Sequence, residues 1–284
     1  METTARGDVP KTLQTIAYIS IPNSSDLEFL LWDLQDAIAA YARLSDTVLP
    51  HPVDLKADDA GAVDGMVLAV DDAFDDEAMI AVEQILDRLR NTETRIYVVV
   101  QALSKNNKQT DEVLDRLYRA CILRDLPWCD GVVICAGSGI AALRHSPRMG
   151  LLRRPFSEAM DKLVGAVRMG CSIEHAQLLG GGNAGSVDAD GMVRVEPAVP
   201  TPIWRAIIKR LGAHAQSNFY IRERPSQRPR ASARQGVPGA MPHWRDLSTA
   251  ERWPAARCVL VDSACRADQL YHRCISPAQW ELRR

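Results

Sequence analysis

Apolar and polar residues alternate with two different periods along residues 1–220. Short runs rich in β-branched residues predict five β-strands, at residues 12–21, 46–55, 65–70, 95–103 and 131–136. Between them, apolar residues recur every three or four positions, which predicts helices at residues 27–44, 77–90, 111–124, 155–169 and 202–211. Pro50 and Pro52 place the second strand at the edge of a sheet, because proline cannot donate to a strand ladder.

This succession of strands and helices predicts an α/β fold. The connections are too long for hairpins, so the strands should run parallel with helices on both faces of the sheet. Five strands fit a flavodoxin-like doubly wound sheet of order 2-1-3-4-5, and they also fit half of a Rossmann sheet. We therefore expect one flavodoxin-like domain over residues 1–220, with its core at 12–172 and a helical extension at 173–220.

The periodicity weakens after Met169. Three glycines at 180–182 and a turn sequence at 188–191 separate only short apolar pairs. This pattern predicts a flexible loop that contains a small hairpin.

Charge divides the chain into two unlike parts. Residues 1–220 hold 22 basic against 30 acidic residues, and residues 221–284 hold 12 against 6. The acidic balance of the first part argues against nucleic acid as a partner, since phosphate binding needs a basic face. The 12 basic residues of the tail are all arginine and lie among prolines, serines and alanines without periodicity. We expect this tail, residues 221–284, to be disordered or not to be selected protein sequence.

Composition also bears on the cellular location. No apolar run approaches the roughly 18 residues that a membrane span requires, and the N-terminal METTARGDVPK contains no apolar signal region. The seven cysteines are scattered, and we expect Cys129 and Cys135 to be small buried core residues. These features predict a cytoplasmic protein with reduced thiols and no membrane partner.

The segment after the first predicted strand is the main candidate for a ligand site. In an open α/β sheet, ligands bind beyond the carboxyl ends of the strands, near the point where the strand order reverses. Asn23, Ser24 and Ser25 lie there, where hydroxyl and free backbone N–H groups at a helix start can bind an anion. Ser25 and Glu28 also have the S-x-x-E spacing of a capping box, which needs no ligand.

Three stretches together resemble one family. SIPNSSDLEFLLWDL resembles the first loop and helix of the flavodoxin-like NAD(P)H-dependent FMN reductases, whose usual pattern is Gly-Ser-Pro-Arg continued by Asn-Ser-Asn-Thr. Residues 95–139 are similar to the fourth strand, helix and fifth strand of that family, with Leu126-Pro127-Trp128 ahead of a glycine-rich strand end. PAVPTPIWRAIIKRLG is similar to the closing helix of the family, and the resemblance covers residues 12–220.

The resemblance implies flavin chemistry at the carboxyl edge of the sheet. The phosphate site of the family corresponds here to Pro22, Asn23, Ser24 and Ser25. The ring site corresponds to Phe74, Gln101, Ala102 and Leu103. FMN would then carry electrons from NAD(P)H to a small-molecule acceptor, and no catalytic acid or base of the protein is implied. Dimers are common in the family, so a homodimer is a further expectation.

Departures from the family pattern keep other functions open. Ser20 and Ile21 stand where Gly-Ser is usual, and the third loop reads DDAFDDE. Asp26 stands in place of Thr, and we expect its negative charge to oppose a phosphate in the first loop. The alternative is therefore a flavin-free flavodoxin-like binding or regulatory module.

The sequence contains two further sets of residues that could bind a metal. The third loop could hold Mg²⁺ or Ca²⁺ in a hydrolase, but its spacing is better explained as an acidic helix start, and we expect no metal site there. Zinc-ligand types at Cys258, Cys265, His272 and Cys274 have a spacing that matches no zinc finger.

Overall fold

The computed structural model describes residues 9–55, 63–180 and 187–222, with side chains as far as residue 213. These residues belong to one unit, Met1–Pro225, and the second unit is Ser226–Arg284. Most of the predicted tail and the cysteine and histidine set at 258–274 therefore lie outside the described residues.

Six parallel strands form one sheet in the order β2-β1-β3-β4-β5-β6. They are β1 (Thr15–Ile21), β2 (His51–Val53), β3 (Gly65–Asp71), β4 (Arg95–Gln101), β5 (Trp128–Ile134) and β6 (Met192–Val195). The first five strands have the flavodoxin-like order expected from the sequence, so the fold prediction is confirmed.

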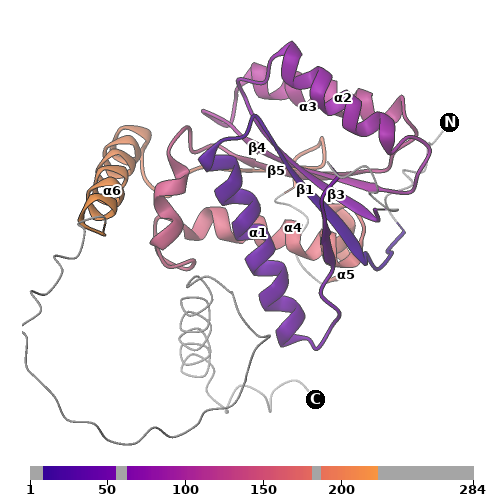
Figure 1. Ribbon diagram of the computed structural model, residues 1–284, viewed down its shortest axis with the longest axis horizontal. Helices are drawn as coiled ribbons and strands as arrows, with labels where there is room; N and C mark the ends of the chain where they lie inside the picture. Colours follow the sequence, from indigo (N-terminus) through magenta and orange to yellow (C-terminus); the bar gives the residue numbers. More distant parts are fainter. Residues whose placement is uncertain (1–8, 56–62, 181–186, 223–284) are drawn as a thin grey trace, which may run out of the picture. The chain divides into compact units, whose positions relative to one another are not determined.

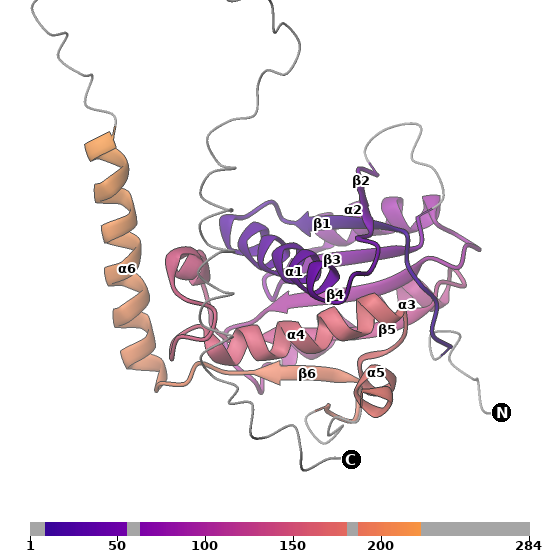
Figure 2. The same cartoon turned by 90° about the horizontal axis from the view of Figure 1, so that it is seen from below.

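Helices cover both faces of this sheet (Figure 1). They are α1 (Ser25–Leu44), α2 (Asp76–Arg88), α3 (Lys108–Ile122), α4 (Arg154–Met169), α5 (Ile173–Leu179) and α6 (Thr201–Arg222), with one 3-10 helix, η1 (Ile140–His145). Helices α1 and α4 lie on one face, and α2 and α3 lie on the other (Figure 2). In the part of the chain that the structure describes, no helix combines the length and apolarity needed to cross a membrane.

The central strands β3 and β4 explain why the sheet forms. Both are buried along nearly their whole length. Their side chains alternate between the two cores: Val67 and Ala69 pack with α1 and α4, whereas Leu68 and Val70 pack with α2 and α3. A strand that is covered on both faces needs a continuous apolar run, and this is the pattern that the sequence displays.

Strand β6 corrects the expected hairpin. It pairs in parallel with β5, and among the described residues it has no antiparallel partner. The turn sequence starts the strand instead, because the N–H of Gly191 donates to the carbonyl of Asp188 at 3.0 Å. Arg194 on β6 then binds Asp188 at 3.1 Å and Asp111 on α3 at 2.9 Å, which holds this short edge strand in place.

Candidate functional site

The loops that follow the strands gather at one edge of the sheet, because all six strands run in the same direction. Strand order reverses at β1 and β3: the chain leaves β1 for β2 on one side and reaches β3 on the other. The site that this topology favours is therefore formed by the loops after β1 and β3, with contributions from those after β4 and β5.

The loop after β1 leads directly into α1. Ser24 is the N-cap, with extended backbone, and its hydroxyl accepts a hydrogen bond from the N–H of Leu27 at 3.3 Å. The expected capping box at Ser25 and Glu28 is therefore wrong by one residue. Ser25 lies in the first turn of the helix and is exposed. The cap thus leaves the Ser25 hydroxyl available at the helix start, next to the exposed Asn23.

Asp26 connects α1 to the loop after β5. Its carboxylate accepts hydrogen bonds from the backbone N–H groups of Gly139 at 2.6 Å and Ala141 at 2.9 Å. It also accepts one from the side-chain amide of Gln101 at 3.1 Å. These two N–H groups belong to the start of η1, so the carboxylate satisfies the free donors of that helix. The negative charge of Asp26 is held by three protein donors.

Of the residues expected beside a flavin ring, two are covered by the core. Phe74 is 5% exposed and Ala102 is 1% exposed, and both pack in the cluster under α2 and α3. Gln101 is buried at the end of β4, where its amide also donates to the carbonyl of Gly137 at 2.7 Å. Leu103 has 59% of its surface exposed. The fold thus brings Gln101 to the first turn of α1 and directs Phe74 into the core.

Asp72 connects the loops after β3 and β4. Its carboxylate accepts a hydrogen bond from the backbone N–H of Leu103 at 2.7 Å and another from the side chain of Asn107 at 2.8 Å. Asn107 is itself the N-cap of α3. The backbone N–H of Leu103, just after β4, is therefore already hydrogen-bonded to a carboxylate of the protein.

The remaining acidic residues of the loop have structural roles. Asp75 is the N-cap of α2 and accepts a hydrogen bond from the N–H of Ala78 at 2.8 Å. Asp76 pairs with Arg116 on α3 at 2.7 Å. Among the described residues, no group of His, Cys, Asp or Glu side chains is arranged to hold a metal ion.

Asp71, at the end of β3, has a carboxylate that hydrogen bonds satisfy only in part. One of its oxygens is buried without a hydrogen-bond partner. Burial raises the pKa of this carboxyl group, and the neighbouring carboxylates Asp72 and Asp75 raise it further. Because the folded-state pKa lies above the unfolded one, the folded protein loses stability as the pH rises from the unfolded to the folded pKa.

We expect Asp71→Asn to be more stable than the wild-type chain at pH 7. The amide removes a charge that folding disfavours, and the partial exposure of the group limits the gain to an increase in Tm of about 1–3 °C. The gain should disappear as the pH falls into the ordinary titration range of aspartate, because the wild-type carboxyl is then protonated as well. Thermal unfolding of both chains between pH 4 and pH 7 is the measurement, and a lower Tm for the variant at pH 7 would contradict the assignment.

A pocket of about 200 Å³ lies beyond the carboxyl end of β5. Its walls include Leu103 after β4, Gly137 and Ser138 after β5, and Trp204 and Arg205 on α6. The sequence predicts Leu103 at the site but not the two α6 residues. They follow β5 by about 70 residues in the chain. The one sequence signal for them is that a tryptophan and an arginine are adjacent in the predicted helix.

The pocket wall also contains a cysteine that is unsuited to nucleophilic chemistry. Cys135 is 4% exposed, and burial raises the pKa of its thiol to about 12. Cys129 is fully buried, and burial raises its pKa to about 12 as well. Both thiols are therefore neutral at pH 7, and the prediction that they are buried core residues is confirmed.

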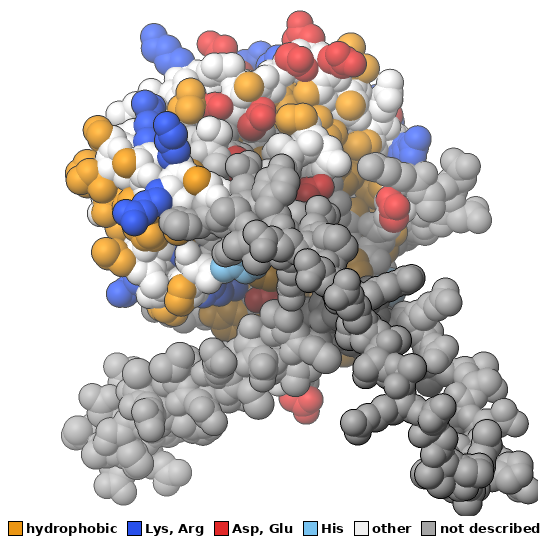
Figure 3. All heavy atoms as spheres, turned by 60° about the vertical axis from the view of Figure 1, so that its left-hand side comes forward, with side chains coloured by type: hydrophobic (Ala, Val, Ile, Leu, Met, Phe, Trp, Pro, Cys, Tyr) orange, Lys and Arg blue, Asp and Glu red, His pale blue; other side chains and the backbone are white. Residues whose placement is uncertain are grey.

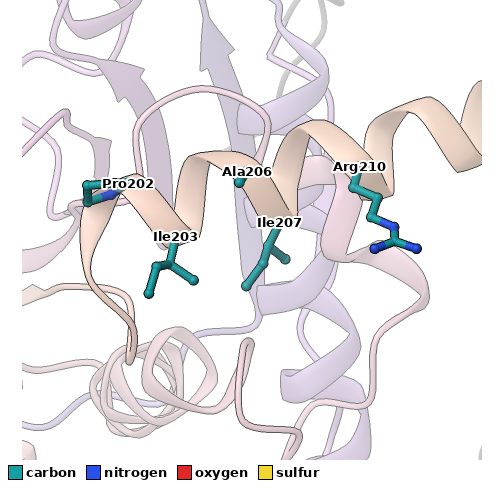
Figure 4. A pocket seen from close by; sticks show the side chains of 5 residues that line it. All are labelled: Pro202, Ile203, Ala206, Ile207 and Arg210. Carbon is teal, nitrogen blue, oxygen red and sulfur yellow. The ribbon is translucent and has the colours of Figure 1, made fainter.

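The outer face of α6 is both apolar and basic. Pro202, Ile203, Ala206, Ile207 and Arg210 line a shallow groove of about 400 Å³ (Figure 4). Ile203 is 53% exposed, and the helix contains no acidic residue. Figure 3 shows hydrophobic and basic side chains intermingled on the left of the face it presents. The described lining of this groove comes from one helix, so it does not enclose a small ligand.

Comparison of the chain with protein-family models, with curated proteins and with solved structures gave no match. Its function must therefore be inferred from the geometry of the sheet edge.

Proposed function

We propose that this chain is an FMN-binding oxidoreductase that takes electrons from NAD(P)H and passes them to a small-molecule acceptor. The observation that supports the proposal best is the loop after β1. It lies where the strand order reverses and presents Asn23 and Ser25 at the start of a 20-residue helix. Backbone N–H groups and hydroxyls in this position favour a phosphate group.

The arrangement of Asp26 removes the main objection to a phosphate at this loop. A carboxylate in the first turn of α1 would repel a phosphate dianion if its charge were free. Here the carboxylate accepts hydrogen bonds from Gly139, Ala141 and Gln101, so three donors offset that charge. In the proposed complex, Pro22, Asn23, Ser24 and Ser25 hold the phosphate, and Gln101 and Leu103 border the ring.

FMN, when bound, supplies the hydride and electron transfer. The residues of the chain bind and orient it: the first loop holds the phosphate end, and the loops after β3 and β4 position the ring. A homodimer and a cytoplasmic location remain predictions of the family resemblance and of the composition.

Titration of the purified full-length chain with FMN tests the proposal. We expect saturable quenching of flavin fluorescence and FMN-dependent oxidation of NADH or NADPH. Ser25→Asp adds a negative charge at the proposed phosphate and should weaken FMN binding by about tenfold or more. Gln35→Asp is the matched control, because it adds the same charge at an exposed position further along α1 and should leave FMN binding unchanged. A colourless chain that does not quench FMN fluorescence would rule the proposal out.

A flavin-free binding or regulatory module is the second candidate, and Asp72 is the observation that favours it. Its carboxylate takes the N–H of Leu103, a donor that a flavin ring bound after β4 would need. Phe74 lies in the core and offers little surface for a ring to contact. The same titration separates the two candidates, since this module remains folded and shows no FMN binding.

A further inference from the structure

The pocket between the loop after β5 and α6 is distinct from the proposed phosphate loop. It borders the carboxyl ends of β4, β5 and β6, whereas the phosphate loop follows β1 on the other side of β3 in the sheet. The pocket shares Leu103 with the proposed ring site, but an inference about it needs no flavin and does not rest on the flavin proposal.

The apolar wall of the pocket is held rigidly. Trp204 is 2% exposed, and its indole N–H donates to the carbonyl of Ala136 at 2.7 Å. Its ring also packs against Phe156 on α4, with 5.5 Å between the ring centroids. On the opposite side, the N–H of Gly137 donates to the carbonyl of Ala102 at 2.9 Å. The wall is therefore in place before any ligand binds, and a ligand loses little free energy in ordering it.

Arg205 is the charged residue of this pocket. Within the described residues it makes no hydrogen bond or ion pair, although it lines the cavity. Arg205 is exposed, whereas two arginines with little exposed surface are paired with protein carboxylates: Arg194 binds three aspartates, and Arg153 binds a buried one. A planar guanidinium that is not paired with protein carboxylates can bind an external carboxylate through two parallel hydrogen bonds.

Size and lining define the class of ligand. The cavity of about 200 Å³ is smaller than the roughly 300–1,000 Å³ of a drug-sized site, so its ligand is small. Leu103, which is 59% exposed, offers apolar surface, Trp204 supports the wall from beneath, and Ser138 provides a hydroxyl beside Arg205. Charges around Cys135 are mixed in sign, with Glu196 and Asp72 opposing Arg194 and Lys105, so the preference for an anion comes from Arg205 itself.

We propose that this pocket binds a small carboxylic acid with an apolar body. Arg205 binds the carboxylate, Ser138 donates a further hydrogen bond, and the body lies against Leu103, on the wall that Trp204 supports.

Benzoate is a suitable probe, because it combines one carboxylate with a small apolar ring. The full-length chain, without FMN, is titrated with benzoate and followed by two-dimensional ¹H–¹⁵N NMR. We expect saturable shifts at the amides of Gly137 and Ser138 and at the indole N–H of Trp204. Benzamide has the same shape without the charge, and it should bind about tenfold more weakly or worse.

Variants on α6 test the role of the guanidinium. Arg205→Ala should weaken benzoate binding by about tenfold or more, and Arg205→Lys should recover part of the loss. Arg210→Ala is the matched control, because it removes an arginine from the same helix outside this pocket and should leave the affinity unchanged. The absence of saturable shifts, or equal affinities for benzoate and benzamide, would overturn the proposal. So would an Arg205→Ala chain that folds like the wild type and binds benzoate equally well.

Discussion

Replacing Asp33 with alanine is expected to lower the free energy of unfolding by about 3–5 kcal/mol. Asp33 on α1 is 3% exposed and pairs with Arg153, which is 5% exposed at the start of α4. Arg153 also donates to the carbonyl of Ser146 at 2.9 Å, and its guanidinium lies 5.1 Å from the ring centre of Phe29. Without Asp33, the buried guanidinium of Arg153 loses its carboxylate partner. An unpaired charge in the core is unfavourable, and this explains the large loss of stability. Urea unfolding at pH 7 measures the effect.

Two further variants isolate the buried pair. Glu158→Ala breaks the exposed Arg154–Glu158 pair at the start of the same helix and should cost no more than about 0.5 kcal/mol. Replacing both Asp33 and Arg153 with leucine and methionine should recover most of the loss, because no unpaired charge then remains in the core. If Asp33→Ala lowers the free energy of unfolding no more than Glu158→Ala does, the ion pair with Asp33 is not what stabilises buried Arg153.

The sequence predicted the central strands best, and burial explains why. The runs at 65–70 and 95–103 correspond to β3 and β4 within two residues, since a strand covered on both faces must be apolar throughout. The edge strands were harder to predict. The expected strand at 46–55 shortens to His51–Val53. The sequence of β6 predicts part of a hairpin, because the strand has only four residues, two of them buried.

The candidate site was predictable in its position but not in its contacts. Ligands bind where the strand order of an open α/β sheet reverses, and this rule selects the loop after β1. Applying it requires only the predicted order of the strands. The contact between Asp26 and Gly139 joins residues 113 positions apart, and neither residue carries a local signal of the other. For the same reason the sequence suggested that Asp26 opposes a phosphate, whereas its carboxylate is engaged by the start of η1.

Asp26→Ala should therefore destabilise the domain by about 2–4 kcal/mol, because two backbone N–H groups at the start of η1 lose a charged acceptor. Hydrogen exchange gives the sharper readout: the amides of Gly139 and Ala141 should lose protection, while the amides in the centre of β4 keep theirs. Asp26→Asn retains one acceptor oxygen, so one of the two amides should remain protected. Glu28→Ala, at an exposed position in the same turn of α1, is the control and should change neither amide. Unchanged protection of both amides in Asp26→Ala would show that the loop after β5 is held by other contacts. Loss at these amides alone would establish that a carboxylate in the first turn of α1 organises the far side of the sheet edge.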